Sequence, residues 1–182
     1  RKHGFSLYGP IPIRRIAPLC KEKKTNAARL LDREGISYEL IPYVVDEHDL
    51  SAAHVAESLG EDVKSVFKTI VLRGDKQGCL VCVVPGDSEV DLKRAAKASG
   101  NKKVEPLPLK ELLPLTGYIR GGCSPIGMKK HFPTYFDASA EEQPFIYVSA
   151  GVRGLQLKVA PADLLRCCAA VYASLTPEKH DS

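Results

Sequence analysis

Residues 66–84 read VFKTIVLRGDKQGCLVCVV, and this stretch decides the fold. Its two apolar runs, 66–73 and 79–84, are rich in Val, Leu and Ile, and a polar connection with two glycines separates them. β-branched residues favour strands, and glycine allows the backbone angles of a tight connection. The stretch therefore predicts a β-hairpin of two apolar strands.

The rest of the chain predicts further strands and short helices around this hairpin. Strands bounded by turn residues are expected at 36–45, 102–106, 133–139, 144–150 and 155–160. Helices bounded by capping residues, glycines or prolines are expected at 25–34, 51–60, 91–100, 108–114 and 161–175. Pro42 indicates an edge or a bulge in the first strand.

The order of these elements indicates the fold class. Strands and helices do not alternate as regular β-α-β units, so the class predicted is α+β. A single domain from 24 to 176 accounts for all the elements. Residues 1–23 are expected to be an N-terminal extension outside the core, and residues 177–182 a tail.

Composition excludes several functional classes. Of the 182 residues, 44% are hydrophobic and 26% charged, which is typical of a globular domain. No apolar run approaches the 18 residues of a membrane span, and residues 1–20 lack the apolar core of a secretory signal. We therefore expect a cytoplasmic protein that does not contact a membrane.

The six cysteines and five histidines do not have the spacing of a metal site. Cys79 and Cys82 lie three apart in a predicted strand, where their side chains point to opposite faces. Small buried thiols in a reducing compartment explain them. We assign no metal and no cofactor.

Lys68 is an unusual residue for its position, because it stands inside the apolar run VFKTIVL. A half-buried ammonium there would hold a phosphate or polarise a carbonyl. The alternative is a lysine on the solvent-facing side of the strand, with its apolar stem lying along the surface. The run by itself does not separate the two.

Residues 116–130, TGYIRGGCSPIGMKK, contain four glycines and a Ser-Pro turn. Such a loop can direct free backbone N–H groups at an anion or a developing oxyanion. A tight surface turn is the alternative. Ser149 and Arg153, in a second Gly-containing turn, have a similar pair of interpretations: they orient a substrate or contact its phosphate, or they are ordinary turn residues.

Basic residues cluster in two places and predict a phosphate-attracting patch if they share one face. A solvated helix face is the alternative. Together with Arg153, which could meet a phosphate, the basic residues in question are Lys93, Arg94, Lys97, Lys129 and Lys130.

Four blocks of sequence stand in the order and spacing of a known family. They are KTNAARLL (24–31), VFKTIV (66–71), TGYIRGGCSPIGMKK (116–130) and IYVSAGVRGLQL (146–157), with DLKRAAKASGNKKVE (91–105) between the second and the third. Together they resemble the YbaK family, the bacterial Cys-tRNA(Pro) deacylases, which is similar to the editing domain inserted in bacterial prolyl-tRNA synthetases. The resemblance covers residues 24–175.

This resemblance implies a trans-editing enzyme. It would hydrolyse the ester between a wrong amino acid, typically cysteine, and the terminal adenosine of tRNA(Pro). The enzyme would be a carboxylic-ester hydrolase, or would act by a lyase-like cleavage in which the thiol of the substrate attacks. Its partners would be the acceptor end of tRNA(Pro) and prolyl-tRNA synthetase. The implied fold is a mixed, strongly curved, barrel-like sheet surrounded by short helices.

The resemblance also implies the site residues. The residues expected to be catalytic are Lys68, Gly121, Gly122 and Ser149, and those expected to bind substrate are Tyr43, Thr69, Ser124, Pro125 and Gln156. Lys68 would hold a phosphate or the ribose, and backbone amides near Gly121 and Gly122 would stabilise the oxyanion. Cys123 has no neighbouring base and is interpreted as a loop residue.

Gln156 departs from the family, which often has an acid at this position. The preferred amino acid therefore stays open, with alanine as an alternative to cysteine. Two other functions also remain: a non-catalytic module that binds tRNA or a synthetase through the basic face, and a small nucleotide-binding regulator.

Overall fold

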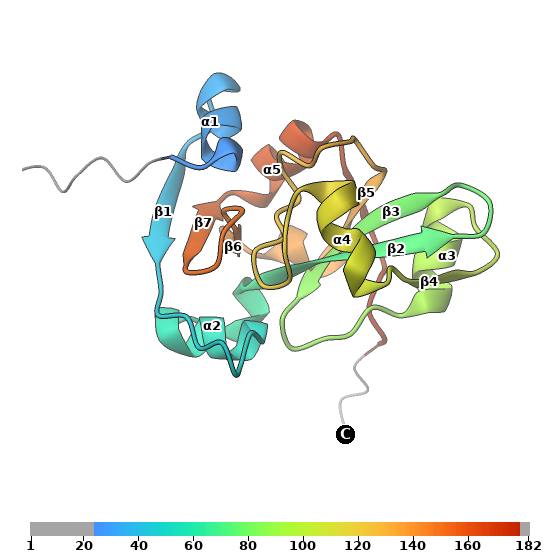
Figure 1. The fold of residues 1–182 in the computed structure, drawn as a ribbon, viewed down its shortest axis with the longest axis horizontal. Helices are drawn as coiled ribbons and strands as arrows, with labels where there is room; N and C mark the ends of the chain where they lie inside the picture. Colours follow the sequence, from blue (N-terminus) through green and yellow to red (C-terminus); the bar gives the residue numbers. More distant parts are fainter. Residues whose placement is uncertain (1–23, 179–182) are drawn as a thin grey trace, which may run out of the picture.

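A computed structural model describes the chain from residue 24 to residue 178, with eight strands arranged in two sheets (Figure 1). The predicted N-terminal extension (1–23) and the last four residues of the predicted tail lie outside the described residues. The strands are β1 (Tyr38–Pro42), β2 (Phe67–Gly74), β3 (Cys79–Pro85), β4 (Val104–Pro106), β5 (Thr134–Asp137), β6 (Ile146–Ser149), β7 (Leu155–Val159) and β8 (Val171–Ala173). The α-helices are α1 (Asn26–Arg33), α2 (Ala52–Leu59), α3 (Leu92–Ser99), α4 (Leu109–Thr116) and α5 (Pro161–Cys168). Two short 3-10 helices are η1 (Val63–Ser65) and η2 (Ala138–Glu142).

The predicted hairpin forms the middle of the larger sheet, whose strand order is β4-β2-β3-β5-β8. β2 and β3 pair antiparallel, with Lys68 opposite Val84, whereas β3–β5 and β5–β8 are parallel pairs. Phe67 and Val71 of β2 face the main hydrophobic core, and Leu72 packs on the other face against α3. The prediction of a mixed α+β fold is confirmed.

The prediction of a barrel is wrong. Among the described residues, the backbone pairing between the smaller sheet, β1-β7-β6, and the larger one is an isolated bridge between Val66 and Tyr147. The two edge strands of the larger sheet, β4 and β8, have three residues each. Closure requires an unbroken ladder of strands, and edges this short leave the sheets open.

Three helices begin and end where their capping residues predict. The side chains of Thr25, Ser51 and Asp91 accept hydrogen bonds from the first turns of α1, α2 and α3. Gly60 and Gly100 then end α2 and α3 in the left-handed conformation, which glycine adopts without steric cost.

Two predicted helices differ in length. α4 continues past Pro114 to Thr116, so proline does not bound it on that side. The last helix, predicted to reach Leu175, ends at Cys168, because Ala169 takes a left-handed conformation with φ 50°. Residues 171–173 then form β8 beside β5.

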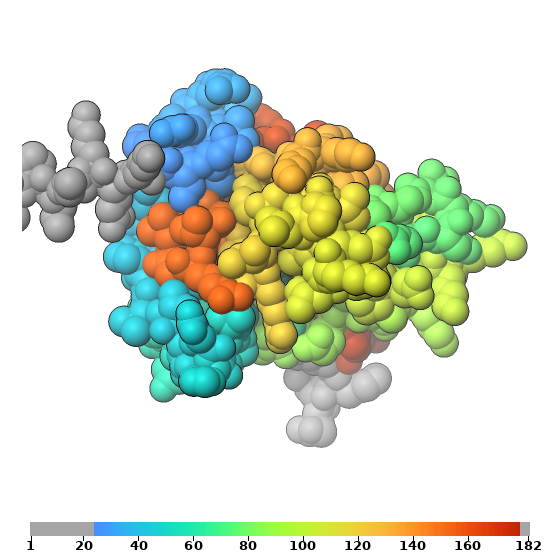
Figure 2. Space-filling model, in the orientation of Figure 1, coloured from blue at the N-terminus to red at the C-terminus, as the bar shows by residue number. Residues whose placement is uncertain are grey.

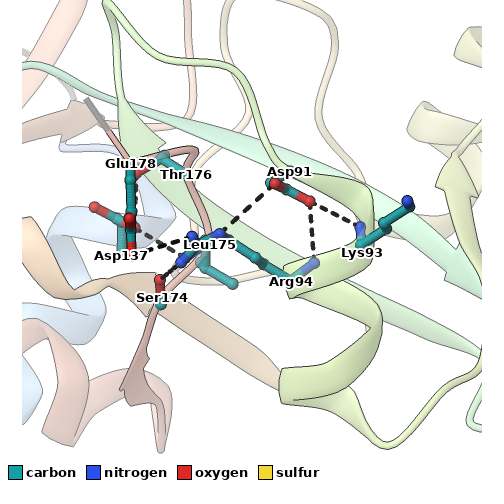
Figure 3. Close-up of polar contacts among 8 residues, drawn as sticks. All are labelled: Asp91, Lys93, Arg94, Asp137, Ser174, Leu175, Thr176 and Glu178. Atoms are coloured by element: carbon teal, nitrogen blue, oxygen red, sulfur yellow. Dashed lines mark hydrogen bonds and ion pairs between the residues drawn. The ribbon is translucent and has the colours of Figure 1, made fainter. Parts of the chain in front are cut away.

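Hydrogen bonds to Asp137 at the end of β5 and to the start of α3 hold the end of the described chain in place (Figure 3). The Asp137 carboxylate accepts hydrogen bonds from Leu175 N at 3.0 Å and from Thr176 Oγ1 at 3.2 Å. Asp91 N donates to Leu175 O at 2.7 Å, and the Arg94 guanidinium donates to Ser174 Oγ. These bonds hold Leu175 fully buried in the α3 cluster.

Candidate active site

A cleft of about 600 Å³ opens where the two sheets meet. Its walls come from the start of β2, the β1–α2 loop, the loop after β3, the β4–α4 region, the Gly-rich loop and the ends of β6 and β7. The polar or glycine residues lining it are His48, Asp49, Ser51, Lys68, Thr69, Gly86, Glu89, Arg120, Gly121, Cys123, Ser149 and Gln156. Apolar walls between them come from residues such as Leu50, Phe67, Leu107 and Leu112.

Lys68 supplies a cation to this cleft. Its Nζ lies 3.2 Å from Glu89 Oε1, and its side chain is 24% exposed whereas that of Glu89 is 92% exposed. A pair with one partner so exposed is screened by water and contributes about 0–1 kcal/mol to stability. The ammonium can therefore exchange Glu89 for an anionic ligand at little cost.

Two buried oxygens in the cleft have no hydrogen-bond partner among residues 24–178. They are Thr69 Oγ1 and Gln156 Oε1, and both residues line the cleft. An unsatisfied buried polar atom costs about 1–3 kcal/mol. Such atoms indicate groups kept ready for a polar ligand.

Ser149 lies directly opposite Gln156 in the β6–β7 pair. Its Oγ accepts a hydrogen bond from Gly151 N at 3.1 Å, as expected of a turn serine. It nevertheless lines the cleft, and its hydroxyl proton is not used by that bond. No histidine ring among the described residues is hydrogen-bonded to Ser149, so the arrangement is not a catalytic triad.

The Gly-rich loop offers backbone amides, but not all those expected. Gly122 is buried and its N–H donates to Ile119 O at 3.0 Å, which closes a turn and leaves no donor for a ligand. Gly121 and Cys123 line the cleft, and their amides have no acceptor among the described residues. Gly121 has φ +82°, a conformation that favours glycine.

The Cys123 side chain is not an activated nucleophile. Burial raises the pKa of its thiol to about 12, so the thiol stays protonated near neutral pH. A reactive cysteine needs the opposite shift, caused by a base or a helix N-terminus.

Comparisons with known proteins identify the family of the chain. A family model described as "Aminoacyl-tRNA editing domain" matches residues 46–167. The chain belongs to this family. A protein of Enterococcus faecalis (strain ATCC 700802 / V583), named "Putative Cys-tRNA(Pro)/Cys-tRNA(Cys) deacylase EbsC", is 49% identical over 158 residues, which cover 87% of this chain and 96% of that protein. "Uncharacterized protein YwhH" of Bacillus subtilis (strain 168) is 28% identical over 123 residues, covering 66% of this chain and 78% of that protein.

The fold of this editing domain also occurs among solved structures. One described as a "putative trans-editing enzyme for prolyl tRNA synthetase" superposes with a TM-score of 0.73. The alignment covers 85% of this chain and 99% of that chain at 24% identity, which supports the fold alone.

Several expected site residues of this editing domain do not line the cleft. Tyr43 packs beside Val66 and Tyr147 in a separate apolar cluster. Ser124 and Pro125 are buried within the Gly-rich loop, where Pro125 O accepts a hydrogen bond from Cys168 Sγ at 3.5 Å.

The basic residues predicted to bind RNA also lie outside the cleft lining. Arg94 is engaged by Ser174, Asp91 and Glu178 in the cluster at the end of the chain (Figure 3). The walls of the cleft do not include the other predicted residues either, which are Lys93, Lys97, Lys129, Lys130 and Arg153. Their contact with RNA stays a prediction.

Sequence reasoning missed part of the cleft. Arg120 and Glu89, both exposed, carry charges at its wall, and His48 and Asp49 come from the loop before the Ser51 cap. Arg120 directly precedes Gly121 in the sequence, so the Gly-rich loop could have indicated that Arg120 lies at the cleft. The others reach the cleft only through tertiary packing.

Two further observations concern residues 24–178. Within them, no three or more His, Cys, Asp or Glu side chains gather in a way that would hold a metal ion. None of their helices has the length and apolar character needed to cross a bilayer.

Proposed function

We propose that this chain is a trans-editing deacylase that hydrolyses the aminoacyl ester of mischarged tRNA, with Cys-tRNA(Pro) as the leading substrate. The proposal rests on the cleft, where the Lys68 cation, two unpaired amides and two buried oxygens without partners face one space. Family membership and the name of the relative from Enterococcus faecalis support it.

The groups that line the cleft would be sufficient for hydrolysis of an aminoacyl ester. An aminoacyl ester is already activated, so binding, orientation and stabilisation of the oxyanion supply the rate. The amides of Gly121 and Cys123 would stabilise the oxyanion, and Lys68 would hold the terminal phosphate or ribose. Water attacks the carbonyl carbon, the ester C–O bond breaks, the free amino acid leaves, and a proton passes to the 3′ oxygen of the tRNA. When the thiolate of a cysteinyl substrate attacks instead, it displaces the 3′ oxygen, which takes up a proton, and water then opens the resulting thiolactone.

The substrate partner would be the acceptor end of tRNA(Pro), and prolyl-tRNA synthetase would supply the mischarged tRNA. Gln156, buried and neutral, lies beside Ser149 where the amino acid would be recognised. A neutral amide imposes no charge requirement on the amino acid, so mischarged alanine is the second substrate to examine.

The test compares wild type with Lys68→Met on a panel of mischarged tRNAs, following release of free amino acid. Lys76→Met, on the exposed β2–β3 turn, is the matched control. We expect wild type and the control to be active and Lys68→Met to lose about 100-fold or more in kcat/KM, a typical effect of removing charge stabilisation. Its fold should survive, because the Lys68–Glu89 pair contributes little to stability.

The panel also separates the other functions. A non-catalytic binding module would bind tRNA without releasing any amino acid, and a nucleotide-binding regulator would bind free nucleotides without tRNA. Absence of release by wild type from every mischarged tRNA would refute the enzymatic proposal.

A further inference from the structure

The turn between β6 and β7 lies directly against the Gly-rich loop. Figure 2 shows the two segments in contact, the turn in orange and the loop in gold. A Cβ built on Gly122 would lie 3.3 Å from Arg153 N and from the Val152 backbone. A Cβ built on Gly121 would lie 3.3 Å from Arg153 Nε and 3.5 Å from Arg153 Cγ. Arg153 thus touches the loop with both its backbone and its side chain.

The side chain makes one polar contact with that loop. Arg153 Nε donates a hydrogen bond to Arg120 O at 2.9 Å. No carboxylate among residues 24–178 is paired with this guanidinium. A charged donor makes a stronger bond to a carbonyl than a neutral donor does.

The hydrogen bond to Arg120 O also restrains the direction of the Gly121 N–H. The Arg120 carbonyl and the Gly121 N–H belong to the same peptide unit, which is planar and trans, so they point in opposite directions. Holding Arg120 O against the β6–β7 turn therefore turns the Gly121 N–H away from that turn. The bond from Gly122 N to Ile119 O restrains the next peptide unit.

We propose that Arg153 is a positioning residue that sets the orientation of the Gly121 amide as an oxyanion donor. This inference rests on the proposed deacylase function. The observed bond uses Nε, and contact of the rest of the guanidinium with RNA is the competing role that the test below separates. A side chain at position 121 would disturb this arrangement, because its Cβ would lie 3.3 Å from Arg153 Nε.

The test measures kcat and KM separately for Arg153→Met and Arg153→Lys. Arg29→Met, an exposed position on α1, is the control. Two substrates are used: cysteinyl-tRNA(Pro), and 3′-O-cysteinyl-adenosine, which has no phosphate. We expect Arg153→Met to lower kcat about 10- to 100-fold on both substrates, below the loss for removing an oxyanion donor outright. KM should stay within about twofold, and Arg153→Lys should retain more activity, because its ammonium can also donate to Arg120 O.

A second readout does not depend on turnover. In Arg153→Met the ¹H–¹⁵N resonance of Gly121 should shift, while that of Gly100, which caps α3, stays in place. If Arg153→Met is destabilised, the same measurement can be made on Arg153→Lys.

The outcomes are distinct. A raised KM for tRNA with unchanged turnover of the adenosine ester would mean that Arg153 binds phosphate, and would overturn the inference. Unchanged kcat together with an unmoved Gly121 resonance would overturn it too. Inactivity of the wild type on both substrates would instead refute the proposed function.

Discussion

Gln156→Met should stabilise the protein while it impairs function. Gln156 is 5% exposed, and its Oε1 has no hydrogen-bond partner within the part of the chain that the structure describes. Leaving a buried polar atom unsatisfied costs about 1–3 kcal/mol, and methionine fills a similar volume without that atom. In a domain of this size each kcal/mol shifts Tm by about 2–4 °C, so a rise of about 2–12 °C is expected. Thr69→Val, which removes the other unpaired oxygen, should also raise Tm.

The same changes should weaken catalysis. If the substrate satisfies Gln156 Oε1, losing that hydrogen bond costs about 1.4–2.7 kcal/mol, or about 10- to 100-fold in kcat/KM. Thermal unfolding by calorimetry and release of amino acid from Cys-tRNA(Pro) measure the two effects on the same samples. Gln77→Met, exposed in the β2–β3 turn, is the control and should change neither quantity.

The result that would refute this reasoning is a Tm that stays level or falls in both Gln156→Met and Thr69→Val. The two oxygens would then be satisfied in the free protein. Their position in the cleft would no longer indicate a ligand.

Two other predictions concern a residue of the cleft and a residue of the core. Cys123→Ala should keep kcat/KM within about threefold of wild type at pH 6–8, because burial holds the pKa of the thiol near 12 and the protonated thiol is no nucleophile; a loss above tenfold in amino-acid release would contradict this. Asp137→Asn should lower the free energy of unfolding by about 3 kcal/mol, measured by urea denaturation, because the carboxylate accepts bonds from Leu175 N, Thr176 Oγ1 and Ser139. A loss under 1 kcal/mol would show that the cluster in Figure 3 does not hold the end of the chain.

Local signals predicted the elements that local chemistry controls. The caps at Thr25, Ser51 and Asp91 act within one helical turn, and the β2–β3 hairpin joins neighbouring strands. The length of the C-terminal helix was mispredicted because the apolar residues up to Leu175 have the spacing of a helix. In the structure Leu175 is buried two residues after the end of β8. Only the parallel pairing with β5, distant in sequence, decides between the two.

The candidate site shows the same limit. Lys68 stood out because a charge interrupts an apolar run, and the structure places it in the lining of the cleft. The sequence cannot distinguish the roles of Gly121 and Gly122. In the structure the Gly122 N–H donates to Ile119 O, whereas the Gly121 N–H has no acceptor among the described residues. Which amide of a Gly-rich loop can donate depends on peptide orientation, and that follows from contacts such as Arg153 with Arg120 O.

The unpaired groups of the cleft would allow the proposed deacylase to act without a protein nucleophile. Among residues 24–178, Lys68 is paired only with an exposed carboxylate, two amides lack acceptors, and two buried oxygens lack partners. A ligand that completes these bonds best at the transition state gains the most, and that difference is what accelerates a reaction. Since the ester is already activated, specificity then depends on the lining residues beside the carbonyl. One substitution there, such as a neutral Gln156 in place of an acid, would change the preferred amino acid and leave the hydrolytic apparatus intact.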